Sequence, residues 1–280
     1  MTTFLNSHQT IDDAYLAILG AANATGRGKL FHTVITVNSP TIASRPGVVA
    51  RVNQQLALAG SQEVGTVANT LFPGELYTPP AFAWSKELSA EQVRELDEAA
   101  ADFYEAYLTA YPLIKKHSDN ERGTYFGRMI LWPTAAADKA NQLARRIKHV
   151  RGKKNFHAAD IALGGEGDPG LPGIQIYAAT DTRTRAFPCL VHLGLTVEAG
   201  RISMSAHYRN WHLITKAYGN LVGLSRLLQF LADQTGLEVG ELMIVAGGAD
   251  VERSHYGKRA GVQKFVADLS SILNPTLAVA

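Results

Sequence analysis

Apolar residues recur at helical spacing in several long stretches of the chain. Residues 10–23 open with the capping residue Thr10 and two acids before the apolar positions begin. Residues 89–117 start with a Ser-x-x-Gln capping box and stay amphipathic for several turns. The strongest pattern covers residues 219–236, where four leucines share one stripe and Gly236 ends the helix. The same spacing predicts further helices over residues 47–60, 138–154 and 258–273.

Alternating or β-branched apolar runs predict strands elsewhere. Residues 29–40 alternate and end at Asn-Ser-Pro, and residues 189–197 form an apolar run. The turn Glu-Ala-Gly at 198–200 joins that run to an alternating run at 201–209, which predicts a hairpin. Two more strands are predicted, over residues 173–179 and 240–252. Because no internal repeat or linker divides the chain, we expect a single α+β domain over residues 1–280.

The glycine-rich stretch GGEGDPGLPG, residues 164–173, contains the pattern Gly-x-Gly-x-x-Gly. A dinucleotide-binding loop needs that pattern between a strand and a helix, because the pyrophosphate binds at the helix N-terminus. No strand is predicted before this stretch and no helix after it, and a proline lies inside it. The pattern therefore favours a surface loop over a dinucleotide site.

The charge balance favours a small-molecule partner. The chain has 27 basic and 25 acidic residues, which leaves a formal net charge of +2. A dedicated nucleic-acid binder carries a stronger basic field. One cysteine cannot form an intrachain disulfide, the N-terminal segment lacks a signal-peptide pattern, and no long stretch is apolar throughout. We therefore expect a cytoplasmic protein without nucleic-acid or membrane partners.

The lone cysteine, Cys189, stands behind a proline at the head of a predicted strand. Arg209 ends the paired strand of the hairpin, so its guanidinium could lie close to the thiol. A fixed cation lowers the pKa of a thiol and raises its thiolate fraction, as a nucleophile requires. A buried cysteine in a strand is also among the commonest core residues. The pattern leaves both roles open.

Asn220 is a polar residue on the apolar stripe of the helix predicted over residues 219–236. A buried amide needs hydrogen-bond partners, which either the backbone or a ligand can supply. A carboxamide offers a donor and an acceptor side by side, and these match the O4 acceptor and the N3–H donor of a uracil ring. Asn220 is therefore either a core amide or a reader of a base.

Two acids, Asp250 and Glu252, alternate onto one face of the strand predicted over residues 240–252. Such a pair binds sugar hydroxyls, acts as general acid and base, or forms ion pairs, and the sequence leaves these roles open. His207 and His212 have no acidic or cysteine ligand at metal spacing, so we expect no metal site.

The residues around Cys189 and Asn220 resemble the thymidylate synthase superfamily. The stretch FPCLVHLGLTVEAGRISMSAHYRNW is similar to that family's Pro-Cys strand, hairpin and phosphate-binding turn. GNLVGLSRLLQFLADQTGLEVGELMIVAGGADVE is similar to its Asn-led helix, Leu-Glu-x-Gly turn and late strand. The spacing agrees, with 20 residues from Cys189 to Arg209, 11 on to Asn220 and 30 more to Asp250. Weaker likenesses lie in DDAYLAILGAANATGRGKL, TYFGRM and the closing LAVA.

The resemblance implies a layered mixed sheet with packed helices, assembled as a homodimer. It implies that Cys189 adds to C6 of a pyrimidine nucleotide, which lets C5 attack the one-carbon unit of 5,10-methylenetetrahydrofolate. Arg209 then holds the nucleotide phosphate and keeps Cys189 ionised, while Asn220 reads uracil. The apolar tail that ends at Ala280 is placed at the folate.

The chain departs from the family at several positions that the resemblance assigns to the substrate. Asp250 and Glu252 stand where the family has a ribose-binding His and Tyr, with Asp250 also a candidate catalytic acid. His212 replaces an Asp, Asn210 replaces a Ser, and Arg27 lies near the position of a phosphate-binding Arg. We therefore expect methyl or hydroxymethyl transfer to C5 of a uridylate-type nucleotide, other than ordinary dTMP synthesis. The alternative is nucleotide binding without the transfer.

Overall fold

The computed structural model describes residues 4–82, 87–121, 123–133, 139–152, 161–162 and 188–275. The strands in these ranges are β1 (Phe4–His8), β2 (Lys29–Val37), β3 (Trp132–Pro133), β4 (Lys139–Ala140), β5 (Ile161–Ala162), β6 (Leu190–Glu198), β7 (Arg201–His212) and β8 (Glu238–Asp250). They form a six-stranded sheet in the order β1-β2-β8-β7-β6-β5 and a pair, β3 with β4. β1 runs parallel to β2, whereas β8 runs antiparallel to β2 and β5 antiparallel to β6.

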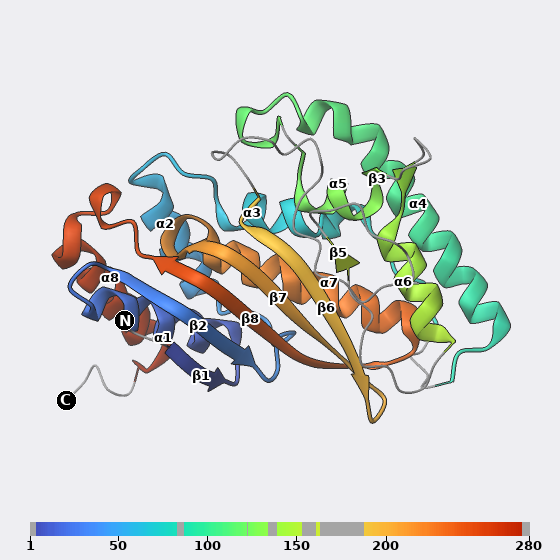
Figure 1. Cartoon of the computed structure of the whole chain (residues 1–280), viewed down its shortest axis with the longest axis horizontal. Coiled ribbons are helices and arrows are strands. Elements are labelled where there is room, and N and C mark those ends of the chain that lie inside the picture. Colours follow the sequence, from blue (N-terminus) through green and yellow to red (C-terminus); the bar gives the residue numbers. More distant parts are fainter. Residues whose placement is uncertain are drawn as a thin grey trace. The chain divides into compact units, whose positions relative to one another are not determined.

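The helices in the described ranges confirm a mixed α+β fold (Figure 1). They are α1 (Ile11–Ala24), α2 (Pro46–Ala57), α3 (Val64–Leu71), α4 (Ala90–Ile114), α5 (Tyr125–Ile130), α6 (Gln142–Arg151), α7 (Tyr218–Thr235) and α8 (Lys258–Leu273). Shorter turns are η1 (Gly74–Leu76), η2 (Ser118–Asn120), the π-helical η3 (Leu213–Ala217) and η4 (Arg253–His255). Among these described helices, none has both the length and the apolar composition that a membrane crossing requires.

The chain divides into two compact units. The first unit combines residues 1–68, 206–225 and 241–280, and the second combines residues 69–205 and 226–240. The elements α3, β7, α7 and β8 run through the boundaries, so each unit contains part of them. The expectation of a single domain over residues 1–280 stays a prediction.

In the first unit, helices cover one face of the sheet. α1 contacts β1, β2 and α8, and α2 contacts α8 (Figure 1). The facing pair Ile35 and Ile244 of β2 and β8 is fully buried. The alternate positions Val34, Met243 and Val245 are only half-buried. Since successive side chains of a strand point to opposite faces, one face of this sheet is core and the other is partly open.

In the second unit, an aromatic cluster forms much of the core. The ring centroid of Phe103 lies 5.2 Å from that of Phe72, 5.0 Å from that of Phe126 and 5.7 Å from that of Phe230. Tilted and edge-on aromatic pairs each contribute about 0.5–1.5 kcal/mol beyond the area that they bury. These rings come from α4, α5, α7 and the segment after α3, so the cluster joins all four.

Most of the predicted helices and strands are confirmed. α8 covers the predicted 258–273, α4 begins with the predicted capping box at Ser89, and Gly236 ends α7 in a left-handed conformation with a φ of 70°. The segment 138–154 differs, because β4 occupies its start and Asn141 then caps α6 through its side chain. The predicted loop 164–173 and strand 173–179 lie outside the described residues.

The strand predicted over 201–209 runs on to His212 and passes without a loop into η3 and α7. Along β7, burial alternates from Ile202 to Tyr208, and the next buried side chain is Trp211. That three-residue step shifts the alternation by one position, as a β-bulge does. The rings of Tyr208 and Trp211 stack with centroids 5.7 Å apart. Arg209 therefore lies inside the strand, at the shift, rather than at its end.

Candidate functional site

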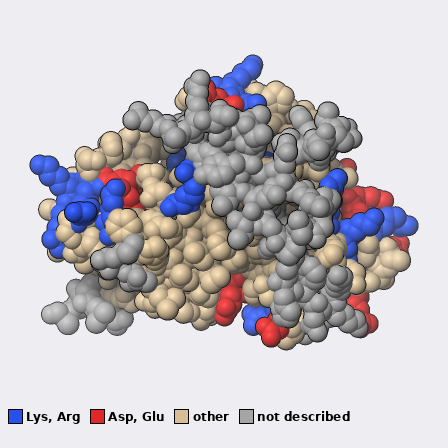
Figure 2. All heavy atoms as spheres, viewed as in Figure 1, with Lys and Arg blue, Asp and Glu red and all other residues tan. Residues whose placement is uncertain are grey.

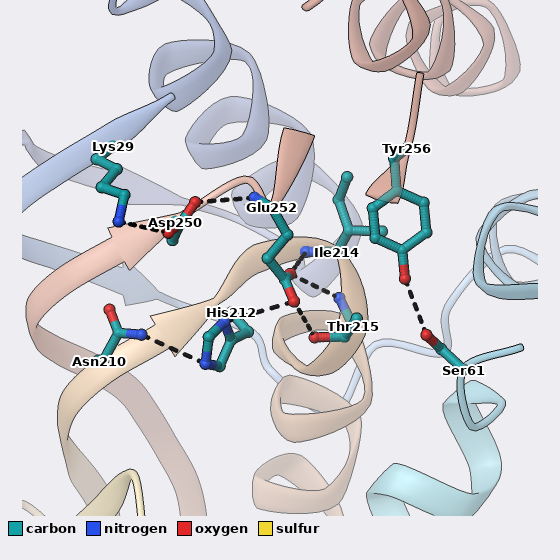
Figure 3. A network of polar contacts seen from close by, with 9 residues as sticks. All are labelled: Lys29, Ser61, Asn210, His212, Ile214, Thr215, Asp250, Glu252 and Tyr256. Carbon is teal, nitrogen blue, oxygen red and sulfur yellow. Dashed lines mark hydrogen bonds and ion pairs between the residues drawn. The ribbon is translucent and has the colours of Figure 1, made fainter. Parts of the chain in front are cut away.

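A polar network joins the ends of β2, β7 and β8 in the first unit (Figure 3). Lys29 Nζ at the start of β2 lies 2.8 Å from Asp250 Oδ2 at the end of β8, because the strand register pairs these residues. Asp250 Oδ1 accepts a hydrogen bond of 2.9 Å from the backbone N–H of Glu252. Of the roles that the sequence leaves open for Asp250, the structure shows the ion pair.

The carboxylate of Glu252 holds the first turn of the helical segment that follows β7. Glu252 Oε2 accepts hydrogen bonds from the backbone N–H groups of Ile214, at 3.2 Å, and Thr215, at 3.1 Å. Glu252 Oε1 accepts one of 2.6 Å from the hydroxyl of Thr215. The side chain is only 12% exposed. A helix N-terminus has unpaired N–H groups and a positive dipole end, so this carboxylate acts as its cap.

The predicted alternation of Asp250 and Glu252 along one strand face is wrong. β8 ends at Asp250, and Glu252 has a left-handed backbone with a φ of 56° and a ψ of 37°. A left-handed conformation is uncommon for a residue other than glycine, asparagine or aspartate. It turns the chain out of the strand, and the Glu252 carboxylate then faces η3 rather than continuing the face that carries Asp250 (Figure 3).

His212 and Asn210 extend this network along β7. Asn210 Nδ2 lies 3.4 Å from His212 Nε2, and His212 Nδ1 lies 3.4 Å from Glu252 Oε1. The second distance is long for a hydrogen bond, so it is a close ionic contact whenever the imidazole is protonated. The His212 side chain is 41% exposed. Of the residues that the resemblance assigns to the substrate, the structure thus brings four together: Asn210, His212, Asp250 and Glu252.

Asn220 is buried at the start of α7, with 3% of its surface exposed. Its Nδ2 donates a hydrogen bond of 3.0 Å to the hydroxyl of Tyr208 on β7. Its Oδ1 is buried and has no hydrogen-bond partner among the described residues. An unpaired buried acceptor costs about 1–3 kcal/mol, so a group that donates to it is favoured there. Tyr208 is not among the predicted site residues, although a hydroxyl on the buried face of β7 is a signal that the sequence offers.

Basic side chains surround the loop after α1. Arg27 is exposed in this loop. Arg253 of η4 donates to the backbone oxygens of Thr25, at 2.9 Å, and Gly26, at 3.0 Å, and to Asn23 Oδ1 at 2.9 Å. Carbonyl groups at a helix C-terminus lack partners within the helix, so this guanidinium ties down the end of α1. Figure 2 shows Lys and Arg side chains gathered over η4 and the start of α8.

Cys189 lies directly before β6 in the second unit, and its side chain is partly exposed. The phenol oxygen of Tyr125 accepts a hydrogen bond of 3.3 Å from the backbone N–H of the next residue, Leu190. Burial, together with the nearby Cys189 thiol, raises the pKa of Tyr125 to about 12. Its phenol is therefore protonated at neutral pH. In the sequence, the segment TYFGRM that contains Tyr125 carries only a weak family likeness.

Arg209 lies on β7 in the first unit, and its side chain is exposed. Cys189 belongs to the other unit. That the Arg209 guanidinium lies close to the Cys189 thiol therefore stays a prediction. Ala280, which the resemblance places at the folate, lies outside the described residues. Comparison of the chain with models of known protein families finds no match.

Replacing Asp250 with asparagine should remove part of the pH dependence of folding stability. Burial alone raises the pKa of Asp250, but the hydrogen bond and charge of Lys29, with the N–H of Glu252, outweigh it and hold that pKa below its ordinary value. A carboxyl with a lowered pKa in the folded state stabilises the protein above its unfolded pKa, near 3.9, and this contribution is lost as the pH falls through the folded value.

Urea unfolding at pH 3 to 7 measures this effect. Because the pair is partly exposed, we expect Asp250→Asn to lower the free energy of unfolding by about 0.5–1 kcal/mol at pH 7. This difference in the free energy of unfolding between the variant and the wild type should shrink as the pH falls below about 4. In a protein that also carries Lys29→Gln, which removes the partner, Asp250→Asn should change the free energy of unfolding less. If the effect of Asp250→Asn in the otherwise wild-type protein grew toward pH 3, Lys29 would not stabilise the charged form of Asp250.

Proposed function

We propose that this chain transfers a one-carbon unit, as methyl or hydroxymethyl, from 5,10-methylenetetrahydrofolate to C5 of a uridylate-type nucleotide. The proposal extends the resemblance to the thymidylate synthase superfamily, which covers the segments around Cys189 and Asn220. In it, Cys189 is the nucleophile, Arg209 binds the nucleotide phosphate, and Asn220 reads the base.

The observation that carries the proposal is the state of the Asn220 amide. Its Nδ2 is bonded to the Tyr208 hydroxyl, and its buried Oδ1 has no partner among the described residues. An acceptor in this position favours a ring with an N–H donor, such as N3–H of uracil. Cytosine has an acceptor at N3 and would leave two acceptors facing each other. The amide therefore supports a uracil base over a cytosine.

The chemistry begins with addition of the Cys189 thiolate to C6 of the ring. The S–C6 bond forms, the C5–C6 π bond breaks, and the electron pair passes through C5 to O4 as an enolate. C5 then attacks the methylene carbon of the folate and forms the C5–CH2 bond. A base removes the C5 proton as the bond from CH2 to the folate nitrogen breaks, which releases tetrahydrofolate and leaves an exocyclic methylene on a ring still bonded to sulfur. Hydride from tetrahydrofolate, which becomes dihydrofolate, or water then adds to this methylene. Elimination of the Cys189 thiolate from C6 restores the ring double bond and leaves a methyl or a hydroxymethyl group.

The partly open face of the first unit's sheet supports the homodimer that we propose with this function. Val34 and Val245 face each other across β2 and β8, and Met243 lies on the same face. All three are half-buried apolar side chains beside a fully buried opposite face. A partly exposed apolar surface of this kind favours a protein partner, and two copies can pack such sheets face to face.

A second candidate is nucleotide binding without the transfer. It is favoured by the bonds that Asp250 and Glu252 make, because both carboxylates stand where the family has ribose ligands. Asp250 is paired with Lys29, and Glu252 is bonded to Ile214 and Thr215. Because these contacts occupy both carboxylates, neither is free to bind a sugar or to move a proton. The chain could therefore bind a nucleotide without transferring a one-carbon unit.

Calorimetry and tritium release on the purified full chain separate the two candidates. UMP, dUMP and CMP are titrated with and without methylenetetrahydrofolate, and release of tritium from C5 of each labelled nucleotide is measured. We expect binding of a uracil nucleotide, weaker binding of CMP, and folate-dependent tritium release. Binding without release on any nucleotide would favour the second candidate, and no binding at all would contradict both.

The phosphate role of Arg209 has its own matched pair of variants. Arg209→Gln should weaken nucleotide binding by about 10- to 100-fold, because a charge-assisted hydrogen bond contributes about 1.5–3 kcal/mol. Arg201→Gln changes an exposed arginine at the start of the same strand, which donates to the backbone oxygen of Val239, and should leave binding unchanged. Equal effects of the two changes on Kd would contradict a phosphate site at Arg209.

A further inference from the structure

The Glu252 carboxylate stands at a position that the resemblance gives to a substrate ligand, yet its bonds are made within the chain. We propose that Glu252 is a positioning residue, which sets the base-reading amide of Asn220 by anchoring the helical turn ahead of it. The inference rests on the proposed function, because it assigns the residue that maintains its base selectivity. Glu252 acts here through η3 and α7 and touches no part of the nucleotide.

The connection from Glu252 to Asn220 is short and continuous. η3 ends at Ala217 and α7 begins at Tyr218, so no loop separates the anchored amides from the base reader. Thr215, which the carboxylate binds, precedes Asn220 by five residues. At 1.5 Å per helical residue, the two lie about 7 Å apart along the axis. A shift of the first turn is therefore passed on directly to the Asn220 side chain.

The acceptor capacity of the Glu252 carboxylate is largely used. An ionised carboxylate offers about four lone-pair sites. Three receive the hydrogen bonds from the amides of Ile214 and Thr215 and from the Thr215 hydroxyl, and Oε1 also faces His212. With 12% of its side chain exposed, Glu252 has little left to offer a sugar hydroxyl. The geometry favours a structural anchor over a ribose ligand.

The left-handed backbone of Glu252 supports the same role. A non-glycine residue held at a φ of 56° persists only where its surroundings stabilise it. Here the turn is closed by the bond from the Glu252 N–H to Asp250, and it carries the carboxylate to η3. The strained turn, Asp250 and the helix cap thus form one connected unit.

A second carboxylate holds the far side of the same helical start. The hydroxyl of Tyr218 donates a hydrogen bond of 2.6 Å to Asp12 Oδ1, and Asp12 is buried. The backbone N–H of Arg45 also donates to Asp12, at 2.9 Å. The start of α7 is therefore fixed at two points, and Glu252 supplies the one nearer to the strand. Removing it frees the N-terminal turn while the bond at Tyr218 remains.

The test uses the full-length chain and the variants Glu252→Gln and Glu252→Ala, with Glu241→Gln as the matched control. Glu241 is an exposed acid on the same strand, β8, away from the start of α7. Glu252→Gln keeps the shape of the side chain and one acceptor oxygen, so the same measurements can be made on it if Glu252→Ala does not fold. Kinetics with UMP and CMP give kcat and KM, and hydrogen exchange followed by mass spectrometry reports on residues 213–221.

We expect Glu252→Ala to reduce the preference for UMP over CMP at least tenfold, with most of the loss in kcat for UMP. Glu252→Gln should recover part of that preference, because it restores one acceptor, and Glu241→Gln should match the wild type. Exchange over residues 213–221 should quicken in the two Glu252 variants alone. A folded Glu252→Gln or Glu252→Ala protein with wild-type selectivity and wild-type exchange would overturn the inference.

Failure of the proposed function gives a different result. If the wild type neither binds nor converts a pyrimidine nucleotide, that function fails. Exchange over residues 213–221 still shows, in that case, whether Glu252 anchors the turn. Faster exchange with unchanged selectivity would overturn the positioning role, because the turn would then be anchored without any effect on the base.

Discussion

Cys189→Ser is expected to abolish the proposed nucleotide turnover, with tritium release from C5 lowered by on the order of 10⁴-fold or more, as in enzymes that lose their nucleophile. The thiolate is the reacting form of cysteine, whereas a serine hydroxyl is almost fully protonated at neutral pH and a weak nucleophile without a base. Without the S–C6 bond, C5 gains no negative charge and its hydrogen does not exchange. Tritium release with labelled UMP and dUMP measures this directly.

The same variant distinguishes chemistry from folding. Because the Cys189 side chain is only partly buried, exchange of sulfur for oxygen should leave the thermal midpoint within a few degrees of the wild type. Nucleotide affinity measured by calorimetry should fall far less than turnover. Tritium release at the wild-type rate in a folded Cys189→Ser protein would exclude the covalent route, and a search for another nucleophile would begin.

Asn220→Asp is expected to lower turnover of a uracil nucleotide by about a hundredfold or more. A site built to hydrogen-bond a group rejects a mismatched partner strongly, because buried polar atoms are then left unpaired. A carboxylate has no donor for O4 of uracil, and it loses the donated bond to the Tyr208 hydroxyl. The N4 amino group of cytosine, by contrast, can donate to it. The ratio of kcat/KM for UMP to that for CMP should therefore fall.

Asn274→Asp is the control for this change. Asn274 follows α8 and is exposed, so the same substitution there should leave the selectivity unchanged. Asn220→Ala adds a second comparison, because it removes the amide without adding a charge and should lower turnover of both nucleotides. An Asn220→Asp protein that keeps the wild-type preference for UMP would show that this amide does not read the base.

The predicted elements that the structure confirms are those whose pattern is strong and local. α4 begins at its predicted capping box, and α8 follows its apolar spacing over the predicted residues. β1 was missed, because its five residues, Phe4–His8, are mostly exposed and do not alternate. Its strand conformation comes from pairing with β2, which lies more than twenty residues away. No local pattern carries that information.

The site was predicted in part. The sequence singles out Asn220, because a polar residue interrupts a leucine stripe, and its burial is confirmed. The sequence does not reveal that Glu252 leaves the strand, since alternation assumes an extended backbone and Glu252 is left-handed. Its partners Ile214 and Thr215 lie almost forty residues earlier in the chain, and only the fold brings them together. The roles of Cys189 and Arg209 stay predictions.

The unbroken passage from β7 through η3 into α7 has a consequence for how this chain can vary. A strand repeats every two residues and an α-helix every 3.6, so one inserted residue would reverse the strand's faces or rotate the helix by about 100°. Either event would swing Asn220 out of its buried place opposite Tyr208. Elsewhere a loop absorbs a change in length, but here nothing lies between strand and helix to do so. In this stretch, variation by substitution is possible, whereas insertion or deletion would disconnect Asn220 from the sheet.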